Sequence, residues 1–274
     1  MSATGITSRG VARVPLADQL RDLADHRDLL SLLVRKELKV KYRGTMLGML
    51  WSLFNPLLLM AVYTAVFSVI TRFPMPNYPI FLLAALLPWT AFAASLSSSV
   101  RSIVGHGNLV RRIRFPVAVL PTSMVIANVV NLLPGFAILL VFALFSRQPL
   151  GLPLVGLPLL VVLQLMFTLG VALVLSALNV YFRDLEYLVG VALMVWFFGT
   201  PVLYPLSAFA GKPVGVLIKL NPMTWLIDSY QRIWHANQWP DGRYLLGFAA
   251  AACLTLVIGG LVFGRASRRF AEEV

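Results

Sequence analysis

The chain has 274 residues, of which 59% are hydrophobic and 12% are charged, and its formal net charge is +12. So little polar surface excludes a soluble globular protein of this size and indicates a polytopic membrane protein. The basic residues lie between apolar stretches, so bilayer topology explains the positive charge better than nucleic-acid binding does. Cys253 is the only cysteine, which excludes an intrachain disulfide and a cysteine-based metal site.

The first predicted element is a basic amphipathic helix that ends just before Gly44. Leucine and valine residues between Leu16 and Leu38 fall near one helical face, whereas the cations gather on another. Each cation near an anionic leaflet contributes about 1 kcal/mol to membrane binding, so we expect this segment to lie along the bilayer surface. An ordinary juxtamembrane basic flank is the alternative. The expected contacts to lipid head groups are Arg35, Lys36, Lys39, Lys41 and Arg43.

Six stretches without Asp, Glu, Lys or Arg follow, and each is long enough to cross a bilayer. They cover residues 44–71, 73–100, 115–146, 148–182, 187–211 and 244–264. A helix needs about 20 residues to cross a hydrocarbon core roughly 30 Å thick. We therefore predict an all-α protein with six transmembrane helices and both termini on one side. A cytoplasmic placement gives that side 17 of the 23 lysine and arginine residues, as the positive-inside rule requires.

Two predicted cytoplasmic connections carry charged residues. In the first, Gly105 and Gly107 break the second span, and Pro116 disfavours helix just before the third span. A short basic helix is expected between them, and its arginines can pair with carboxylates of a partner. A cluster that only directs topology is the alternative. The second connection places Arg183, Asp184 and Glu186 after the fourth span, where solvation at the interface would also explain them.

The longest interruption between spans covers residues 197–243 and is too apolar for a solvated loop. Irregular backbone at membrane depth is stable only where it is buried in protein or lines a water-filled cavity. The prolines of this region therefore predict short broken helices that re-enter the bilayer. Trp225, Tyr230 and Trp234 suit either a membrane interface or a gate. The residues that mark the broken helices are Pro201, Pro205, Pro213, Asn221 and Pro222.

Five segments, taken in their order and spacing, carry a resemblance to a known family. They are RKELKVKYRGTMLGMLWSLFNPLLLMAVYTAVF at the first span, NLVRRIRFP after the second, NVYFRDLEYLV after the fourth, TPVLYP after the fifth and LNPMTWLIDSYQ before the sixth. Together they resemble the permease subunits of ABC-2 type exporters for polysaccharides and polyol phosphates, including O-antigen and teichoic acid exporters. The resemblance covers nearly the whole chain and implies a multi-pass protein of the bacterial plasma membrane.

The resemblance also implies partners. We expect a homodimer that encloses a path for a lipid-pyrophosphate-linked glycan, above two copies of a separate cytoplasmic ABC ATPase. This chain has no G-x-x-x-x-G-K-[ST] loop, so ATP and Mg²⁺ are expected on the ATPase and no cofactor is expected here. The residues implied to contact the ATPase are Asn108, Leu109, Val110, Arg111, Arg112, Arg114, Arg183, Asp184 and Glu186.

The implied organisation has three parts. Residues 1–43 form a cytoplasmic N-terminus with the interface helix, residues 44–264 form the transmembrane domain, and residues 265–274 form a cytoplasmic tail. Within the transmembrane domain, the coupling helix is expected at about 105–116 and the re-entrant outer gate helices at about 205–222.

A path for sugars favours aromatic side chains, because these offer stacking surface for apolar ring faces with few strong holding points. Packing within the bundle or at the membrane interface is the alternative for each ring. The pyrophosphate of the lipid requires cations near the cytoplasmic leaflet, for which Lys41, Arg43 and Arg183 are candidates. The candidate path residues are Tyr63, Trp89, Phe92, Trp196, Phe197, Phe198 and Tyr204.

Other classes of function fit less well. A secondary transporter would commonly carry ionisable residues within its spans, and the charge-free stretches contain none. A membrane transferase would need clustered carboxylates or histidines, whereas His26, His106 and His235 are far apart in sequence. We therefore expect a transport subunit and no enzyme.

The substrate is less defined than the transport class. An ABC-2 permease that exports a small drug or a lipid remains the alternative to a glycan exporter. Eighteen arginines against five lysines hint at a high-GC genome such as that of an actinobacterium, for which a lipid-linked cell-wall galactan is one candidate substrate.

Overall fold

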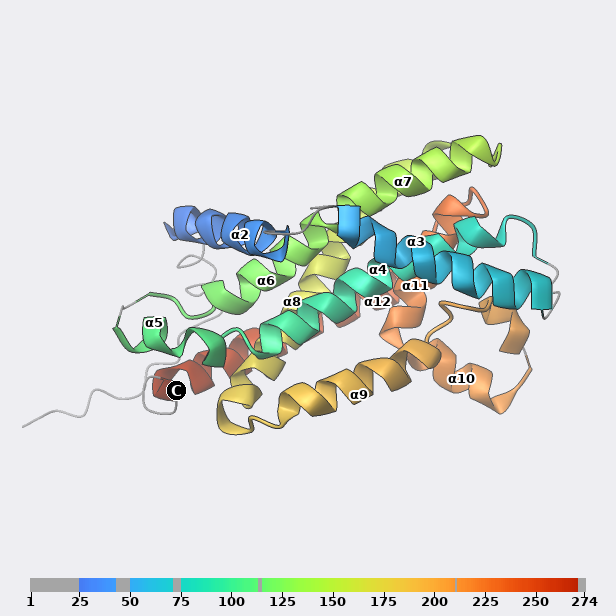
Figure 1. Ribbon diagram of the computed structural model, residues 1–274. Helices are drawn as coiled ribbons and strands as arrows, with labels where there is room; N and C mark the ends of the chain where they lie inside the picture. The colour runs from blue at the N-terminus through green and yellow to red at the C-terminus, as the bar shows by residue number, and fades with distance from the viewer. Residues whose placement is uncertain (1–24, 43–49, 71–74, 113–114, 210, 271–274) are drawn as a thin grey trace, which may run out of the picture.

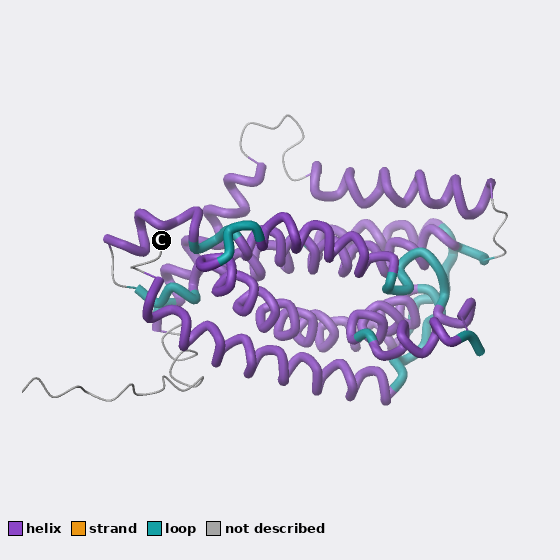
Figure 2. The backbone as a smooth tube through the Cα atoms, turned by 90° about the horizontal axis from the view of Figure 1, so that it is seen from below, coloured by secondary structure: helices purple, strands orange, loops and turns teal. Residues whose placement is uncertain are grey.

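The computed structural model describes residues 25–42, 50–70, 75–112, 115–209 and 211–270, and every structural statement below concerns these residues. Among them the regular structure is helical and no strand occurs. The long helices run lengthwise through an elongated bundle (Figure 1), and the described loops gather toward its two ends (Figure 2).

The described residues form a succession of helices, in which α marks α-helices and η marks other helical turns. Most are interrupted by prolines or by short turns rather than by long loops. The bounds are α2 (Arg27–Tyr42), α3 (Leu50–Thr64), η1 (Ala65–Ile70), α4 (Tyr78–Val100), η2 (Val104–His106), α5 (Gly107–Arg112), α6 (Val119–Val130), α7 (Leu132–Phe145), η3 (Leu152–Gly156), α8 (Leu157–Tyr181), α9 (Leu185–Phe198), η4 (Leu206–Phe209), α10 (Pro213–Leu220), α11 (Pro222–Trp234), α12 (Gly242–Ala266) and η5 (Ser267–Arg269).

Four apolar segments are long enough to cross a membrane, which confirms a polytopic helical protein. They are Tyr78–Val100, Val119–Phe145, Leu152–Tyr181 and Gly242–Ala266. The first three fall within the second, third and fourth predicted spans, and the last extends two residues beyond each end of the sixth. Shorter apolar helices, Phe54–Phe67 and Leu185–Phe198, correspond to the first and fifth predicted spans, and the second of them begins two residues before the predicted stretch. A 14-residue helix is about 21 Å long, which is less than the hydrocarbon thickness. Six spans therefore stay a prediction.

The third span is divided into α6 and α7 at Asn131, which the pattern of charges did not predict. Pro134 explains the division, because proline lacks an N–H group and its ring clashes with the carbonyl four residues earlier. That carbonyl belongs to Val130, the last residue of α6. Beyond the break, α7 still packs one side against α4 and leaves apolar side chains near its C-terminus, such as Leu144 and Phe145, exposed.

The larger of two apolar cores surrounds α4, whose side chains are buried along most of its length. Helices α6, α8 and α11 pack against α4, and α12 packs along α8. Gly170 of α8 and Gly259 of α12 permit that last approach, because a Cβ atom on either would collide with the backbone of the other helix. These contacts make α4, α8, α11 and α12 the rigid centre of the bundle.

The smaller core lies at one end of the bundle, which we call the basic end because α2, α5 and the last turn of α12 meet there (Figure 1). It joins Leu33 of α2 to Ile103, Val119, Phe263 and Phe270. The first and last described helices thus share one end, as expected for an even number of spans. The side of the membrane on which this end lies stays a prediction.

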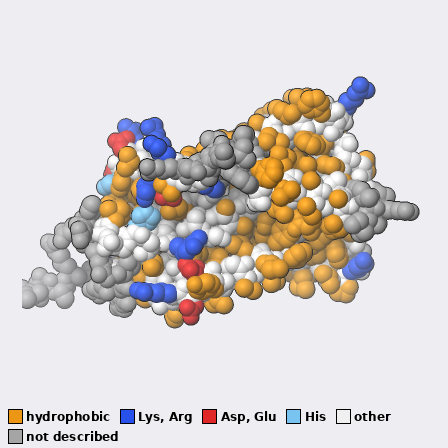
Figure 3. Space-filling model, in the orientation of Figure 1, with side chains coloured by type: hydrophobic (Ala, Val, Ile, Leu, Met, Phe, Trp, Pro, Cys, Tyr) orange, Lys and Arg blue, Asp and Glu red, His pale blue; other side chains and the backbone are white. Residues whose placement is uncertain are grey.

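Charged and apolar side chains are separated along the length of the bundle. In Figure 3, apolar side chains cover the middle of the visible face, whereas most of its charged side chains gather over the basic end. The opposite end, which carries α10, shows only a few cations. This distribution suits a helical bundle whose middle lies in hydrocarbon.

Candidate functional site

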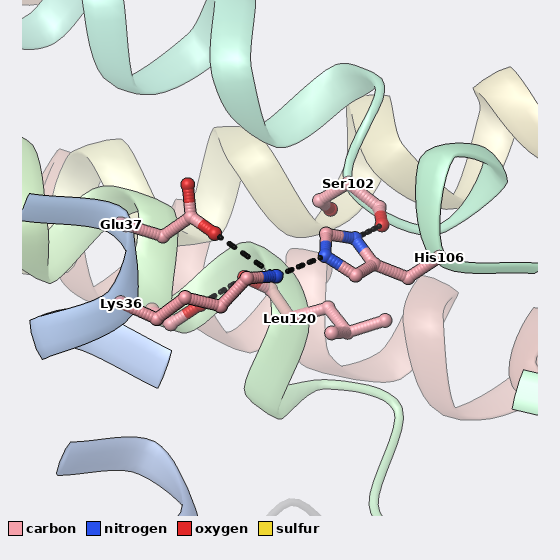
Figure 4. Close-up of polar contacts among 6 residues, drawn as sticks. Lys36, Glu37, Ser102, His106 and Leu120 are labelled. Carbon is pink, nitrogen blue, oxygen red and sulfur yellow. Dashed lines mark hydrogen bonds and ion pairs between the residues drawn. The ribbon is translucent and has the colours of Figure 1, made fainter. Parts of the chain in front are cut away.

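The interface helix α2 is tied to the connection that follows α4. Lys36 Nζ donates a hydrogen bond to His106 Nε2 over 3.1 Å, and His106 Nδ1 lies 2.8 Å from the carbonyl oxygen of Ser102 (Figure 4). A carbonyl can only accept, so Nδ1 carries the hydrogen and His106 is neutral in this arrangement. Glu37 Oε1 lies 3.8 Å from Lys36 Nζ. Sequence analysis treated His106 as isolated, and the structure makes it the contact between α2 and η2.

The other cations predicted on the interface helix are placed differently from one another. Arg35 and Lys39 are exposed on α2. Lys41, near the end of α2, directs Nζ to Asn128 Oδ1 of α6 at 3.1 Å. Arg43 lies outside the described residues. Lys41 is therefore the predicted lipid-contacting residue that reaches into the bundle.

A short helix is present where a coupling helix was expected. The turn η2 leads into α5, on which Asn108 is exposed and Leu109 packs against the smaller core. Val110, Arg111 and Arg112 belong to α5, whereas Arg114 lies outside the described residues. The contact of this helix with an ATPase stays a prediction.

The second charged connection lies at the same end of the bundle. Arg183 and Asp184 are exposed in the turn between α8 and α9, and Glu186 is in the first turn of α9. Glu186 Oε2 lies 4.0 Å from Arg101 Nε at the C-terminus of α4. An exposed pair at this distance contributes roughly 0–1 kcal/mol, so it orients the two connections more than it stabilises them. Sequence analysis did not assign Arg101 to this contact.

Six of the seven candidate path aromatics form one chain of ring contacts across α3, α4 and α9. One contact joins Phe92 of α4 to Trp196 of α9 with 5.3 Å between ring centroids. We call this set the aromatic cluster. Its further contacts are Trp89–Phe197 at 5.6 Å, Trp89–Phe92 at 5.7 Å, Tyr63–Phe197 at 6.4 Å and Phe197–Phe198 at 5.3 Å.

Members of the aromatic cluster differ in what they expose. Phe92 and Trp89 are 0% and 5% exposed, so they pack in the core and offer no surface for sliding contacts in this structure. Tyr63 is half-buried, and Phe198 is 56% exposed. Tyr204 stands apart from the cluster, and its hydroxyl donates to the carbonyl oxygen of Phe198 over 2.7 Å. The rings of α9 are therefore presented outward and supported from behind by α4.

Asn221 joins the aromatic cluster to the region predicted to form the outer gate. Its Oδ1 accepts from Trp196 Nε1 at 2.9 Å and from the Met223 amide at 3.0 Å. Its Nδ2 donates to Thr200 Oγ1 at 2.9 Å and to the Gly199 carbonyl at 3.2 Å. One side chain thus caps the N-terminus of α11 and holds the C-terminal end of α9. Sequence analysis identified Asn221 only as a turn before a proline.

The broken helices predicted after the fifth span are present as η4, α10 and α11. Pro213 and Pro222 begin α10 and α11, where a missing N–H costs nothing. Pro201 and Pro205 lie in the connection after α9, and the Pro201 carbonyl accepts from Gln231 Nε2 at 2.9 Å. Helix α10 exposes apolar side chains, including Leu217 at 70%. Entry of these helices into the bilayer stays a prediction.

The interpretation of Tyr230 and Trp234 as interface or gate aromatics was wrong. Their side chains are 0% and 2% exposed and pack against Phe136. The Tyr230 hydroxyl donates to Gln164 Oε1 at 3.0 Å. They belong to the core because α11 runs against α4, α8 and α12 instead of along the surface. Trp225 is half-buried, and its Nε1 donates to the Lys219 carbonyl at 2.7 Å.

A cavity of about 400 Å³ lies at the α10 end between the connection after α9 and α11. Arg232 Nε donates to Asp228 Oδ2 at 2.7 Å on its wall. Burial raises the pKa of the Asp228 carboxyl, and the bond from Arg232 opposes that effect. His235 also lines the cavity, and its Nε2 lies 2.9 Å from the Pro76 carbonyl.

Comparison with known proteins identifies the family to which this fold belongs. The profile of the ABC-2 type transporter family matches residues 28–234. The chain is 39% identical over 256 residues to the O-antigen export system permease protein RfbA of Myxococcus xanthus, covering 93% of this chain and 98% of that protein. It is 34% and 31% identical over 246 residues to two proteins of the same name from Klebsiella pneumoniae, covering 89% of this chain and 94% of each of them. The resemblance found in the sequence is thereby confirmed, and the chain belongs to the ABC-2 type transporter family as a multi-pass membrane permease.

Proposed function

We propose that this chain is the permease subunit of an ATP-driven exporter. It moves a lipid-linked polysaccharide, of the O-antigen, teichoic acid or cell-wall galactan type, from the cytoplasm to the outer side of the bacterial plasma membrane. The observation that carries this proposal is the match along 98% of a relative named as an O-antigen export permease. An ABC-2 permease for a small drug or lipid is the alternative.

The working unit in this proposal is a homodimer. Helix α9 leaves four large side chains exposed in one protomer, Tyr187, Val191, Met194 and Val195. An exposed apolar face of this kind is typical of a site of protein–protein contact. A second copy facing α9 would place two aromatic clusters on opposite walls of one path. Sugar rings would stack against the exposed ring of Phe198 and the half-buried rings of Tyr63 and Phe197, while Trp89 and Phe92 hold these rings in place.

The basic end faces the cytoplasm in this proposal and receives two copies of a separate ABC ATPase. That partner binds ATP and Mg²⁺, and this chain holds no cofactor of its own. Helix α5 and the Arg183 turn are the contacts that follow from the family. Movement of α5 would reach α2 through the hydrogen bond between His106 and Lys36 and would reach α12 through the smaller core.

The outer gate in this proposal is made by η4 and α10. Asn221 supports this role because it binds α9, which carries path-lining rings, to the helix that follows α10. A shift of α9 would therefore be transmitted to the gate by hydrogen bonds instead of by a flexible linker.

The test is export in the native host. Depletion of the chain should abolish the surface polysaccharide and leave a lipid-linked glycan in the inner leaflet, measured by extraction of lipid-linked saccharides with and without surface protease and glycosidase treatment. Purified permease with the ATPase encoded beside it should hydrolyse ATP faster when that lipid-linked glycan is present. An unchanged surface polysaccharide, together with stimulation by small apolar drugs, would support the alternative and overturn the proposal.

A further inference from the structure

Two adjoining cavities form a groove that begins at Lys41, one of the cations expected at lipid head groups. Their volumes are about 400 Å³ and about 310 Å³, and both are lined by Lys41, Ala94, Asn128 and Asn131. Cavities of roughly 300–1,000 Å³ are typical of small-molecule sites. The groove lies between α2, α4 and α6 and continues toward α3 and the start of α7.

One end of the groove is polar. Lys41 Nζ donates to Asn128 Oδ1 at 3.1 Å, and Asn128 Nδ2 donates to Ser98 Oγ at 3.1 Å. Glu37 and Arg101 line the same end, but they form ion pairs with Lys36 and Glu186. Among the described residues, no carboxylate lies within 4.0 Å of Lys41 Nζ, Glu37 included. The lysine therefore directs its donors into the groove without a direct ion pair to a described carboxylate.

Lys41 is exposed on α2, yet the atoms packed around its ammonium group remove part of the solvation of its charge. Desolvation lowers the pKa of its ammonium group. Asn55, Asn128 and Asn131 add amide groups to the wall from α3 and from the third span. Polar groups within membrane-spanning segments are costly and commonly mark a binding or transport function. A ligand with an anionic oxygen would offset the desolvation of Lys41 and accept from the amides.

The other end of the groove is apolar. It is lined by Pro56, Leu87, Trp89, Leu132 and Gly135, and a small cavity of about 10 Å³ continues it between α3, α4 and α7. This end is narrow, and it stays open because residue 135 is a glycine. A Cβ atom on Gly135 would lie 2.7 Å from Leu87 Cδ2 and would fill it. A site that is cationic at one end and apolar toward the middle of the bundle matches the two parts of a lipid.

We propose that this groove binds a lipid phosphate, with the phosphate between Lys41 and Asn128 and the start of the hydrocarbon chain along α3, α4 and α7. The binding chemistry is shared by two sources, an anionic phospholipid of the bilayer and a polyprenyl diphosphate carrier. The site does not depend on the transported substrate, so it stands whether the chain exports a glycan or another molecule.

Native mass spectrometry of the delipidated full-length chain tests the site. Palmitoyl-oleoyl-phosphatidylglycerol should bind at least about tenfold more tightly than the matched phosphatidylcholine, as expected for a charge-assisted contact to phosphate without a competing choline. Lys41→Met should remove most of this preference. Arg27→Met is the matched control, since Arg27 is an exposed cation on the same helix, lies outside the groove and is not among the expected lipid contacts, and it should keep the wild-type preference.

A second variant keeps the test valid if Lys41→Met does not fold. Ala94→Leu fills the shared wall of both cavities without a change of charge and should weaken both lipids. Equal binding of the two lipids by the wild-type chain would overturn the proposal, as would the same loss in Arg27→Met as in Lys41→Met. Competition by farnesyl diphosphate at equimolar phosphatidylglycerol would support the site with the carrier as its source, whereas resistance to competition with the preference intact would support a resident phospholipid.

Discussion

Asn221 offers the sharpest test of how the path and the gate region are joined. Asn221→Ala removes four hydrogen bonds at once, including the cap of α11. Loss of an N-cap costs about 1 kcal/mol. Each of the other three bonds contributes about 0.5–1.5 kcal/mol, with the lower values for groups that water can reach. Because the site is only half-buried, the expected total is about 2–4 kcal/mol.

The measurement is thermal unfolding of the purified chain in detergent, followed by ion leak in reconstituted vesicles. With a shift of roughly 2–4 °C per kcal/mol for a chain of this size, Asn221→Ala should lower the apparent midpoint by about 4–16 °C. The separation of α9 from α11 should also raise the leak. Asn221→Asp is the control, because it keeps an acceptor for Trp196 and Met223 but loses the donors to Gly199 and Thr200.

The three proteins should differ in a fixed order of stability and of ion leak. Wild type should be the most stable, Asn221→Asp intermediate and Asn221→Ala the least stable, with leak in the reverse order. An Asn221→Ala midpoint equal to that of wild type would refute the claim that this amide holds the two helices together. Lowered stability without added leak would keep the structural role and remove the gate role.

Three further predictions concern the other elements. Arg111→Glu with Arg112→Glu should abolish export and stimulation of the partner ATPase while membrane insertion, measured by fractionation, is unchanged; unchanged export would exclude the coupling role of α5. Phe92→Ala should lower the free energy of unfolding by about 3–5 kcal/mol, because Phe92 is a buried ring. Phe198→Ala should change the free energy of unfolding by no more than about 0.5 kcal/mol and should reduce export. Stability held by Asp228, whose carboxyl pKa is raised, is fully present below its usual value of 3.8 and is lost as pH rises through the folded-state pKa. Asp228→Asn should therefore show a smaller fall in thermal midpoint between pH 4 and pH 7, and an identical pH profile would contradict the assignment.

The spans could be predicted from the absence of charge because hydrocarbon excludes ionised groups over a fixed thickness. That criterion counts residues and ignores backbone chemistry, so it did not show the break at Asn131. The signal was present in Pro134, which disfavours regular helix over the turn before it, although Pro88 is accommodated inside α4 without ending that helix. Similarly, Gly199 and Pro201 end α9 early and leave it shorter than the charge-free stretch that contains it.

The burial of Tyr230 and Trp234 was also readable in principle. Leu226, Ile227 and Ile233 share with them the spacing i, i+1, i+4, i+7 and i+8, which places all five on one face of a helix. Composition led instead to an interface, since tryptophan and tyrosine are common there. The periodicity was the better guide because α11 has a core to pack against on three sides.

Contacts between distant segments could not be predicted from local patterns. Lys36 and His106 are 70 residues apart, and Lys41 and Asn128 are 87 residues apart. Neither pair has a spacing that helix geometry could bring together, so only the packing of α2 across η2 and α6 creates them. The cations were correctly expected on α2, while their partners were not.

These two contacts give α2 a part in the bundle that a surface helix would lack. Lys36 holds the connection that leads to α5, and Lys41 holds the third span just before its break, so two points in the C-terminal half of the helix are fixed to different elements. A displacement of α5 would therefore turn α2 as a lever instead of sliding it along the bilayer. Because Lys41 also lines the groove, such a turn would change the position of its ammonium group relative to Asn128. Docking at the basic end and the proposed lipid phosphate site would in this way be linked through one helix.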